Sequence, residues 1–202
     1  MRLAELVTIA LCVSGLPVAA SAAIITNASF EAPVTGSFVY NPVDPTGGWT
    51  FSGRSGVASG IFFAAPPPDG VQAAFLQQAG DQGSSLSSIT QTVSGVALVS
   101  QTLSFYIALR PGGFAADPIT VSYGSQTLGT FTPVSTAFTL VTINFVPLTT
   151  SGVLRFQSAA GTGADLDTAI DQVSLSTVPE PATYGLMGAA LAGIGFLRRR
   201  KV

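Results

Sequence analysis

The chain is 202 residues long, has a formal net charge of −2, and contains one cysteine and no histidine. The absence of histidine excludes the usual general base of a serine or cysteine nucleophile, and also the common zinc sites. Residues 24–177 carry three arginines, no lysine and eight acidic side chains, a net charge of −5. This segment lacks the basic surface that binds nucleic acid, so we expect no nucleic-acid partner.

The first 23 residues have the layout of an export signal. Arg2 supplies the positive end, residues 6–16 are an apolar stretch, and residues 20–22 form a cleavage site of small residues. We therefore expect a Sec-pathway signal peptide, with cleavage after residue 22 or residue 23. Cys12 is then lost with the signal, and the mature protein has no disulfide.

Residues 24–177 are expected to form one domain built of short strands. The segments are rich in Val, Ile, Thr and Phe, and Gly, Pro, Asp and Ser separate them. The predicted strands are residues 27–31, 49–52, 61–64, 71–77, 86–93, 101–109, 118–123, 127–132, 138–146, 152–157 and 169–175.

The clearest alternation lies at residues 101–109, where Leu103, Phe105 and Ile107 alternate with more polar residues. No segment of the domain has a convincing helical period. Short strands at this spacing predict an all-β fold, an antiparallel β-sandwich, and the length favours a jelly roll.

Several short motifs recur in the order found in galactose-binding-like domains, which include many carbohydrate-binding modules. They are Asn27-Ala-Ser-Phe-Glu31, Trp49, residues 69–76, residues 90–93, residues 103–110 and residues 169–175. The domain resembles that family in its pattern of spacings. The resemblance implies a β-sandwich whose first and last strands lie close together.

The same resemblance implies a structural calcium ion between Glu31 and Asp171. Calcium needs six to eight oxygen ligands, so backbone carbonyls around Asn27 or residues 41–44 would have to complete the shell. The alternative is that both carboxylates cap turns or face water.

The acids Asp165, Asp167 and Asp171 share strand parity and raise the question of catalysis. A glycosidase needs two carboxylates about 5–10 Å apart across its substrate. A solvated loop that enters a strand produces the same spacing, and no other catalytic signature accompanies it. We therefore expect a protein that is not an enzyme.

Sugar binding requires an aromatic ring for stacking and polar side chains for the hydroxyl groups. Trp49, Gln77, Tyr106 and Arg110 are candidates of the right types. The alternatives are that Trp49 is a core residue and that Arg110 pairs with Asp117.

The C-terminal residues 178–202 combine three ordered features. Val178-Pro179-Glu180-Pro181 is followed by a fourteen-residue uncharged apolar run, residues 184–197, and by a basic cluster at residues 198–201. As a helix the run is about 21 Å long, shorter than the roughly 30 Å hydrocarbon core of a membrane. This layout resembles the PEP-CTERM sorting domain of Gram-negative bacteria.

That resemblance implies processing by an exosortase, a membrane-embedded cysteine transpeptidase-like enzyme, after transient insertion of a short transmembrane helix in the inner membrane. The expected destination is the cell surface, the extracellular matrix or the medium. The expected function is non-enzymatic association with extracellular polysaccharide. The alternatives are a secreted glycoside-active enzyme and a structural or adhesion matrix protein without sugar specificity.

Overall fold

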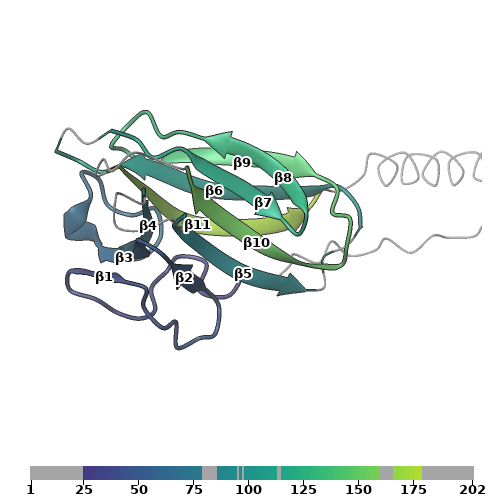
Figure 1. Cartoon of the computed structure of the whole chain (residues 1–202), viewed down its shortest axis with the longest axis horizontal. Helices are drawn as coiled ribbons and strands as arrows, with labels where there is room; N and C mark the ends of the chain where they lie inside the picture. Colours follow the sequence, from purple (N-terminus) through teal and green to yellow (C-terminus); the bar gives the residue numbers. More distant parts are fainter. Residues whose placement is uncertain are drawn as a thin grey trace, which may run out of the picture. The chain divides into compact units, whose positions relative to one another are not determined.

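Eleven β-strands and one short 3-10 helix, η1 (Gly60–Phe62), form the described part of the chain (Figure 1). The computed structural model describes residues 25–78, 86–94, 96, 98–112, 115–159 and 166–178. The strands are β1 (Phe38–Tyr40), β2 (Thr50–Ser52), β3 (Ser55–Ser59), β4 (Gln72–Gln77), β5 (Ser88–Ser94), β6 (Gln101–Leu109), β7 (Ile119–Tyr123), β8 (Gln126–Phe131), β9 (Thr139–Phe145), β10 (Ser151–Ser158) and β11 (Asp167–Thr177).

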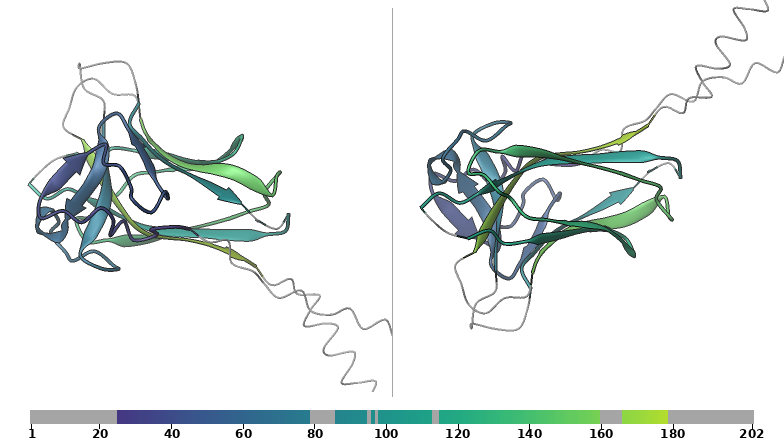
Figure 2. Two further views of the ribbon diagram at one scale, coloured as in Figure 1. Left: turned by 90° about the horizontal axis from the view of Figure 1, so that it is seen from below. Right: turned by 90° about the horizontal axis from the view of Figure 1, so that it is seen from above.

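Two antiparallel sheets pack face to face, as the two views in Figure 2 show. The six-stranded sheet has the order β1-β3-β4-β11-β6-β9, and the five-stranded sheet has the order β2-β5-β10-β7-β8. The predicted all-β class and antiparallel jelly-roll β-sandwich are confirmed. All described residues fall within one compact unit, Ser21–Pro179.

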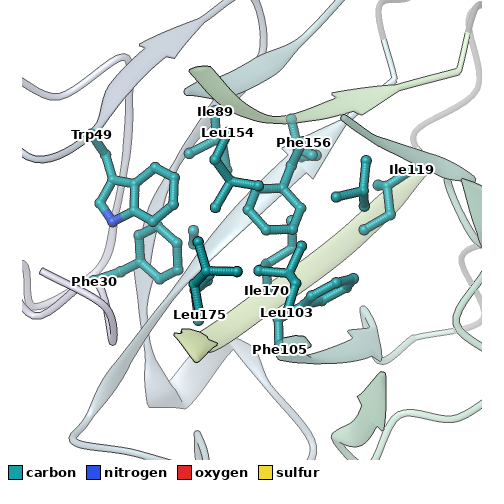
Figure 3. Close-up of a cluster of buried hydrophobic side chains, with 14 of the residues drawn as sticks. Phe30, Trp49, Ile89, Leu103, Phe105, Ile119, Leu154, Phe156, Ile170 and Leu175 are labelled. Atoms are coloured by element: carbon teal, nitrogen blue, oxygen red, sulfur yellow. The ribbon is translucent and has the colours of Figure 1, made fainter. Parts of the chain in front are cut away.

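The core lies between the sheets because alternate side chains of each strand point inward. Leu103, Phe105 and Ile107 of β6 are buried, as their alternation predicts, and they meet Leu154 and Phe156 of β10 in one apolar cluster. Figure 3 shows Leu103, Phe105, Leu154 and Phe156 converging with side chains of neighbouring strands. The sandwich is therefore held together by apolar packing between the two sheets.

The bulge in β11 separates two parts of that strand with different neighbours. The register against β6 shifts between Asp171 and Ser174, and Gln172 has a φ of 49°. Ile170 and Val173 are both buried in the core, although three positions separate them. A β-bulge accounts for this spacing because it inserts an extra residue into one strand.

The strands predicted at residues 27–31 and 61–64 are not present in the structure. Residues 26–29 form a turn, held by the Asn27 side chain, which exchanges hydrogen bonds with the backbone of Ala32. Side chains of this type compete with strand pairing by bonding the local backbone. Residues 61–64 contain the end of η1 and no strand.

The N-terminal segment nevertheless lies beside the last strand, because Val173 N in β11 donates a hydrogen bond to Ala28 O. β1 and β3 have no counterpart among the predicted strands. Both are short, and β3 consists largely of small residues.

The predicted signal peptide, apolar C-terminal run and basic tail lie outside the described residues. Within the described ranges, no helix has the length and apolar character needed to cross a membrane.

Candidate functional site

A pocket opens on the face of the six-stranded sheet that points away from the core. Its cavity volume is about 60 Å³, so it is a small hollow that opens to solvent and can take only part of a larger ligand. Its lining residues come from β1, β3, β4 and β11, from η1 and the residue after it, and from the residue that follows β6. They are Phe38, Tyr40, Ala58, Phe62, Phe63, Phe75, Arg110, Asp167 and Ala169.

Small residues make the hollow possible. Ala58 of β3 and Ala169 of β11 line it, and Gly56 is paired in register with Phe75 of β4. A Cβ atom at Gly56 would lie 2.9 Å from Phe75 Cζ and 1.9 Å from Val39 O. The phenyl ring therefore packs against a position that only glycine can occupy.

Aromatic rings from separate elements form the wall. Phe38 of β1 packs edge-on against Phe62 at a centroid distance of 5.2 Å and against Tyr40 at 5.7 Å. Tyr40 packs edge-on against Phe75, with centroids 5.2 Å apart. Edge-to-face contacts of this kind stabilise one another beyond the area they bury, so the wall is preformed.

Polar groups gather at one end of the pocket. Arg110 Nη1 donates to Asp167 Oδ2 at 2.7 Å in an ion pair. Gln77 is paired in register with Asp167, and Tyr40 Oη donates to Gln77 Oε1 at 2.6 Å. The pocket thus has an aromatic part and a polar end whose charges balance.

Asp117 lies behind this polar end and is fully buried. Its Oδ1 accepts a hydrogen bond from Ala159 N, whereas its Oδ2 has no hydrogen-bond partner among the described residues. Burial, and secondarily the negative charge of Asp167, raise the pKa of Asp117 to about 7. The sequence offers Asp117 only as a partner for Arg110, which in the structure pairs with Asp167.

The raised pKa of Asp117 predicts a pH-dependent stability. The folded protein holds a proton that the unfolded chain releases above pH 3.8, the ordinary pKa. The free energy of unfolding should therefore fall as pH rises from about 4 to about 7, by up to about 4 kcal/mol from this one group. Urea unfolding of Asp117→Asn between pH 5 and pH 8 should show a shallower slope than the unsubstituted protein.

Asp44 supplies the control for that measurement. Burial raises its pKa, but hydrogen bonds from the Trp49 and Thr46 backbones and from side chains outweigh burial and lower it. Asp44 therefore titrates below the tested range, and Asp44→Asn should leave the slope unchanged. An equal slope in the Asp117→Asn and unsubstituted proteins would contradict the assignment.

Two of the four predicted sugar-contact residues are at the pocket. Arg110 lines it, and Gln77 is buried behind it and bonded to the Tyr40 hydroxyl. Tyr106 is half-buried on β6 and paired in register with Asp171. It is not among the residues that line the pocket.

The fourth candidate, Trp49, is a core residue, which corrects its assignment as a ligand contact. Its side chain is 3% exposed, packs between Phe30 and Phe156, and donates its ring N–H to Asn27 O at 2.9 Å (Figure 3). A ring enclosed in this way is not available to stack on a sugar. The aromatic wall was not predicted from the sequence; its sequence signal is limited to the clustering of phenylalanine in residues 62–75, which leaves out Phe38 and Tyr40.

The two predicted metal ligands, Glu31 and Asp171, lie near each other around the segment that precedes β4. Glu31 Oε1 accepts hydrogen bonds from Val71 N and Gln72 N, both at 2.8 Å. Asp171 is fully buried, and its Oδ2 accepts from Asp69 N. Burial first, and then the charges of Asp69 and Glu31, raise the pKa of Asp171 to about 7.

This arrangement fits a hard cation in its electrostatics but not in its side-chain ligand number. Three carboxylates act on one another, and within the described ranges none of them has an ion-pair partner. No group of three or more His, Cys, Asp or Glu side chains is arranged there to hold a metal ion. Backbone oxygens would have to supply the rest of a calcium shell.

The two described acids of the predicted set have different partners. Asp167 is bound to Arg110, whereas Asp171 belongs to the group with Glu31 and Asp69. Asp165 lies outside the described residues.

The end of β11 leads directly into the C-terminal motif. Val178 N donates to Ser100 O at 2.8 Å. Comparison with protein families matches residues 177–201 to the PEP-CTERM protein-sorting motif. The chain carries a PEP-CTERM sorting signal. The sorting signal begins at Thr177, the last residue of β11, and Pro179, Glu180 and Pro181 lie outside the described residues.

Solved structures share the fold of the domain that precedes the PEP-CTERM signal. A Stig cyclase from Fischerella sp. TAU, in complex with (3Z)-3-(1-methyl-2-pyrrolidinylidene)-3H-indole, matches with a TM-score of 0.61 and 20% identity over 79% of this chain and 98% of its own. The K1 cleaved adhesin domain of Lys-gingipain from Porphyromonas gingivalis W83 matches with a TM-score of 0.53 and 11% identity over 74% and 96%.

Carbohydrate-binding modules are also among the structural neighbours. TmCBM61 in complex with β-1,4-galactotriose has a TM-score of 0.49 and 18% identity over 79% of this chain and 100% of its own. A comparison with curated protein sequences gives no match. At these identities the structural likeness describes the fold alone.

Proposed function

We propose that this protein is a non-enzymatic component of the cell envelope or extracellular matrix that binds exopolysaccharide. The observation that carries the proposal is the aromatic-walled pocket with an Arg110–Asp167 ion pair at one end. Aromatic rings offer a stacking surface for the C–H faces of a sugar, and the ion pair offers donors and acceptors for its hydroxyl groups.

The rigidity of the site supports binding. Phe75 and Ala169 lie on the paired strands β4 and β11, and Ala58 lies on β3 beside them. Groups held by a paired sheet lose little freedom when a ligand binds.

Affinity electrophoresis through a gel that contains the native exopolysaccharide of the host tests this proposal. Retardation relative to a gel without polymer is the expected result. Unchanged mobility at every polymer concentration would contradict polysaccharide binding.

The arrangement of carboxylates favours binding over hydrolysis. A glycosidase places two carboxylates beside the scissile bond. Here Asp167 lines the pocket in an ion pair, and the neighbouring Asp117 is fully buried and does not line it. The competing assignment, a glycoside-active enzyme, predicts release of reducing sugar from host polysaccharide by the purified protein. We expect none.

The sorting signal specifies the route. Exosortase processing would remove the tail after transient insertion in the inner membrane, and release the β-sandwich to the surface or matrix of a Gram-negative cell. Intact mass of the mature protein from its host should lack both the first 22 or 23 residues and the basic tail. A mature protein that retains residues 198–201 would contradict processing.

A small ring-shaped ligand is the second candidate, because most of the residues that line the pocket are aromatic or alanine. The Fischerella cyclase, which shares the fold, was crystallised with an indole compound. A thermal-shift titration with indole separates the two: a rise in melting temperature with indole, without retardation by polysaccharide, would favour this candidate.

We also propose that Glu31 and Asp171, with backbone oxygens, hold a structural calcium ion. A bound divalent cation would neutralise the carboxylates of Glu31 and Asp171 and connect the N-terminal turn to β11. Calcium should therefore raise the melting temperature relative to the same protein in chelator. Asp171→Asn removes one negative charge at nearly constant shape and should abolish this response. An identical midpoint with calcium and with chelator in the unsubstituted protein would contradict the site.

A further inference from the structure

The aromatic wall of the pocket offers very few hydrogen-bonding groups. Five of the nine lining residues are aromatic, and the Tyr40 hydroxyl is the single polar atom among their rings. Two more lining residues are alanines. The wall therefore presents an almost entirely carbon surface to a ligand group that lies against it.

The polar groups that the pocket does contain already bond one another. The Tyr40 hydroxyl donates to Gln77, and Arg110 donates to Asp167. A fully hydroxylated sugar carries several hydroxyl groups, and each one buried without a partner costs about 1–3 kcal/mol. The polar end can form hydrogen bonds with the hydroxyl groups that reach it, whereas the aromatic part cannot form such bonds.

Charge restricts the ligand further. The Arg110–Asp167 pair is neutral as a whole, and the carboxyl group of Asp117 lies behind it. A uronic acid would bring a second carboxylate to an arginine that already has one, in a domain of net charge −5. Like charges at short range disfavour each other, so a neutral sugar fits better.

We propose that the pocket selects a neutral sugar residue in which a methyl-bearing group replaces a free hydroxyl group. This inference rests on the proposed sugar-binding function. The methyl-bearing group is either an O-acetyl ester or the C6 methyl of a 6-deoxy sugar. It lies against Phe38, Phe62 and Phe75, while the remaining hydroxyl groups face Arg110 and Asp167.

Two matched ligand pairs test the proposal with the full chain in mild detergent. The first pair is O-acetylated xylan and the same xylan after mild alkaline removal of its acetyl groups, measured by affinity electrophoresis. The second pair is L-fucose and L-galactose, which differ at the C6 hydroxyl, measured by isothermal titration calorimetry. The proposal predicts that the methyl-bearing member of one pair binds about tenfold or more tightly than its partner, the range expected for one apolar group in a hydrophobic pocket.

The pair that shows the preference identifies the source of the methyl group. Equal affinity within both pairs would overturn the proposal and leave sugar binding intact. No binding to any of the four ligands or to the host polysaccharide would overturn both. A preference for the hydroxylated member would overturn the proposal alone.

The variant Phe38→Thr distinguishes the wall from the rest of the molecule. Threonine suits a strand, and β1 is the edge strand of its sheet, so the variant is expected to fold. It replaces a ring by a hydroxyl-bearing side chain, and the ratio of affinities within the responding pair should fall toward one. Val153→Thr, on β10 of the other sheet, is the matched control and should leave the ratio unchanged.

Discussion

Phe62→Ala should weaken polysaccharide binding at least about tenfold, because aromatic residues at the centre of a binding site supply much of its affinity. Phe62 lies on η1, is half-buried, and packs edge-on against Phe38. The substitution removes one ring of the aromatic wall and does not change the core between the two sheets. Affinity electrophoresis against the host polymer gives the ratio of dissociation constants directly.

Val153→Ala is the matched control for Phe62→Ala. Val153 lies on β10 of the five-stranded sheet, and its side chain is 38% exposed. The affinity of Val153→Ala for the polysaccharide should equal that of the unsubstituted protein. If Phe62→Ala retains full affinity with unchanged circular dichroism, the ligand does not use this wall.

Trp49→Ala should lower the free energy of unfolding by about 3–5 kcal/mol, the usual cost of removing a buried aromatic side chain. The ring contacts Phe30 and Phe156, so its loss leaves a cavity between the N-terminal turn and β10. The hydrogen bond to Asn27 O is lost as well. Urea unfolding followed by circular dichroism measures the change.

Trp49→Phe separates these two contributions, because it retains a buried ring and removes the N–H donor. We expect a smaller loss, about 1–2 kcal/mol, from one lost hydrogen bond and the reduced volume, because Asn27 O still accepts a hydrogen bond from Phe30 N. Under conditions where both variants remain folded, sugar affinity should match that of the unsubstituted protein. A selective loss of affinity in a fully folded Trp49 variant would reassign this residue to the binding site.

Strands with alternating side chains were predictable from the sequence. Residues 101–109 match β6 at both ends, and the predicted strand at 71–77 differs from β4 by one residue. In β6 apolar side chains at every second position bury one face, whereas β4 is buried at every position and was recognisable as a short apolar run. In both, the local pattern agrees with the tertiary fold.

The errors arose where local bonding or neighbouring strands decide the structure. Asn27 bonds the backbone of Ala32 and holds a turn where a strand was predicted. β3 contains Gly56 and two serines and has little strand signal of its own, yet it is paired on both sides, with β1 and with β4. Pairing of this kind depends on partners far away in the sequence.

The pocket was predictable only in part for the same reason. Arg110 and Gln77 were identified from their residue types, and both are at its polar end. Its aromatic wall combines Phe38 of β1 and Phe75 of β4, which the sheet order β1-β3-β4-β11-β6-β9 brings close together, with Phe62 of η1. The residue pattern of a single strand does not reveal the order of strands in a sheet, so the wall could be identified only from the structure.

The binding of glycan at the outer face of the six-stranded sheet is tested most directly by nuclear magnetic resonance. Fragments of the host exopolysaccharide are titrated into ¹⁵N-labelled protein, and amide shifts are followed residue by residue. We predict shifts concentrated at Tyr40, Phe62, Phe75 and Arg110, with the outer face of β5 and β10 unchanged. Shifts confined to the five-stranded sheet, or no shifts at saturating polysaccharide, would contradict the assignment of this pocket as the binding site.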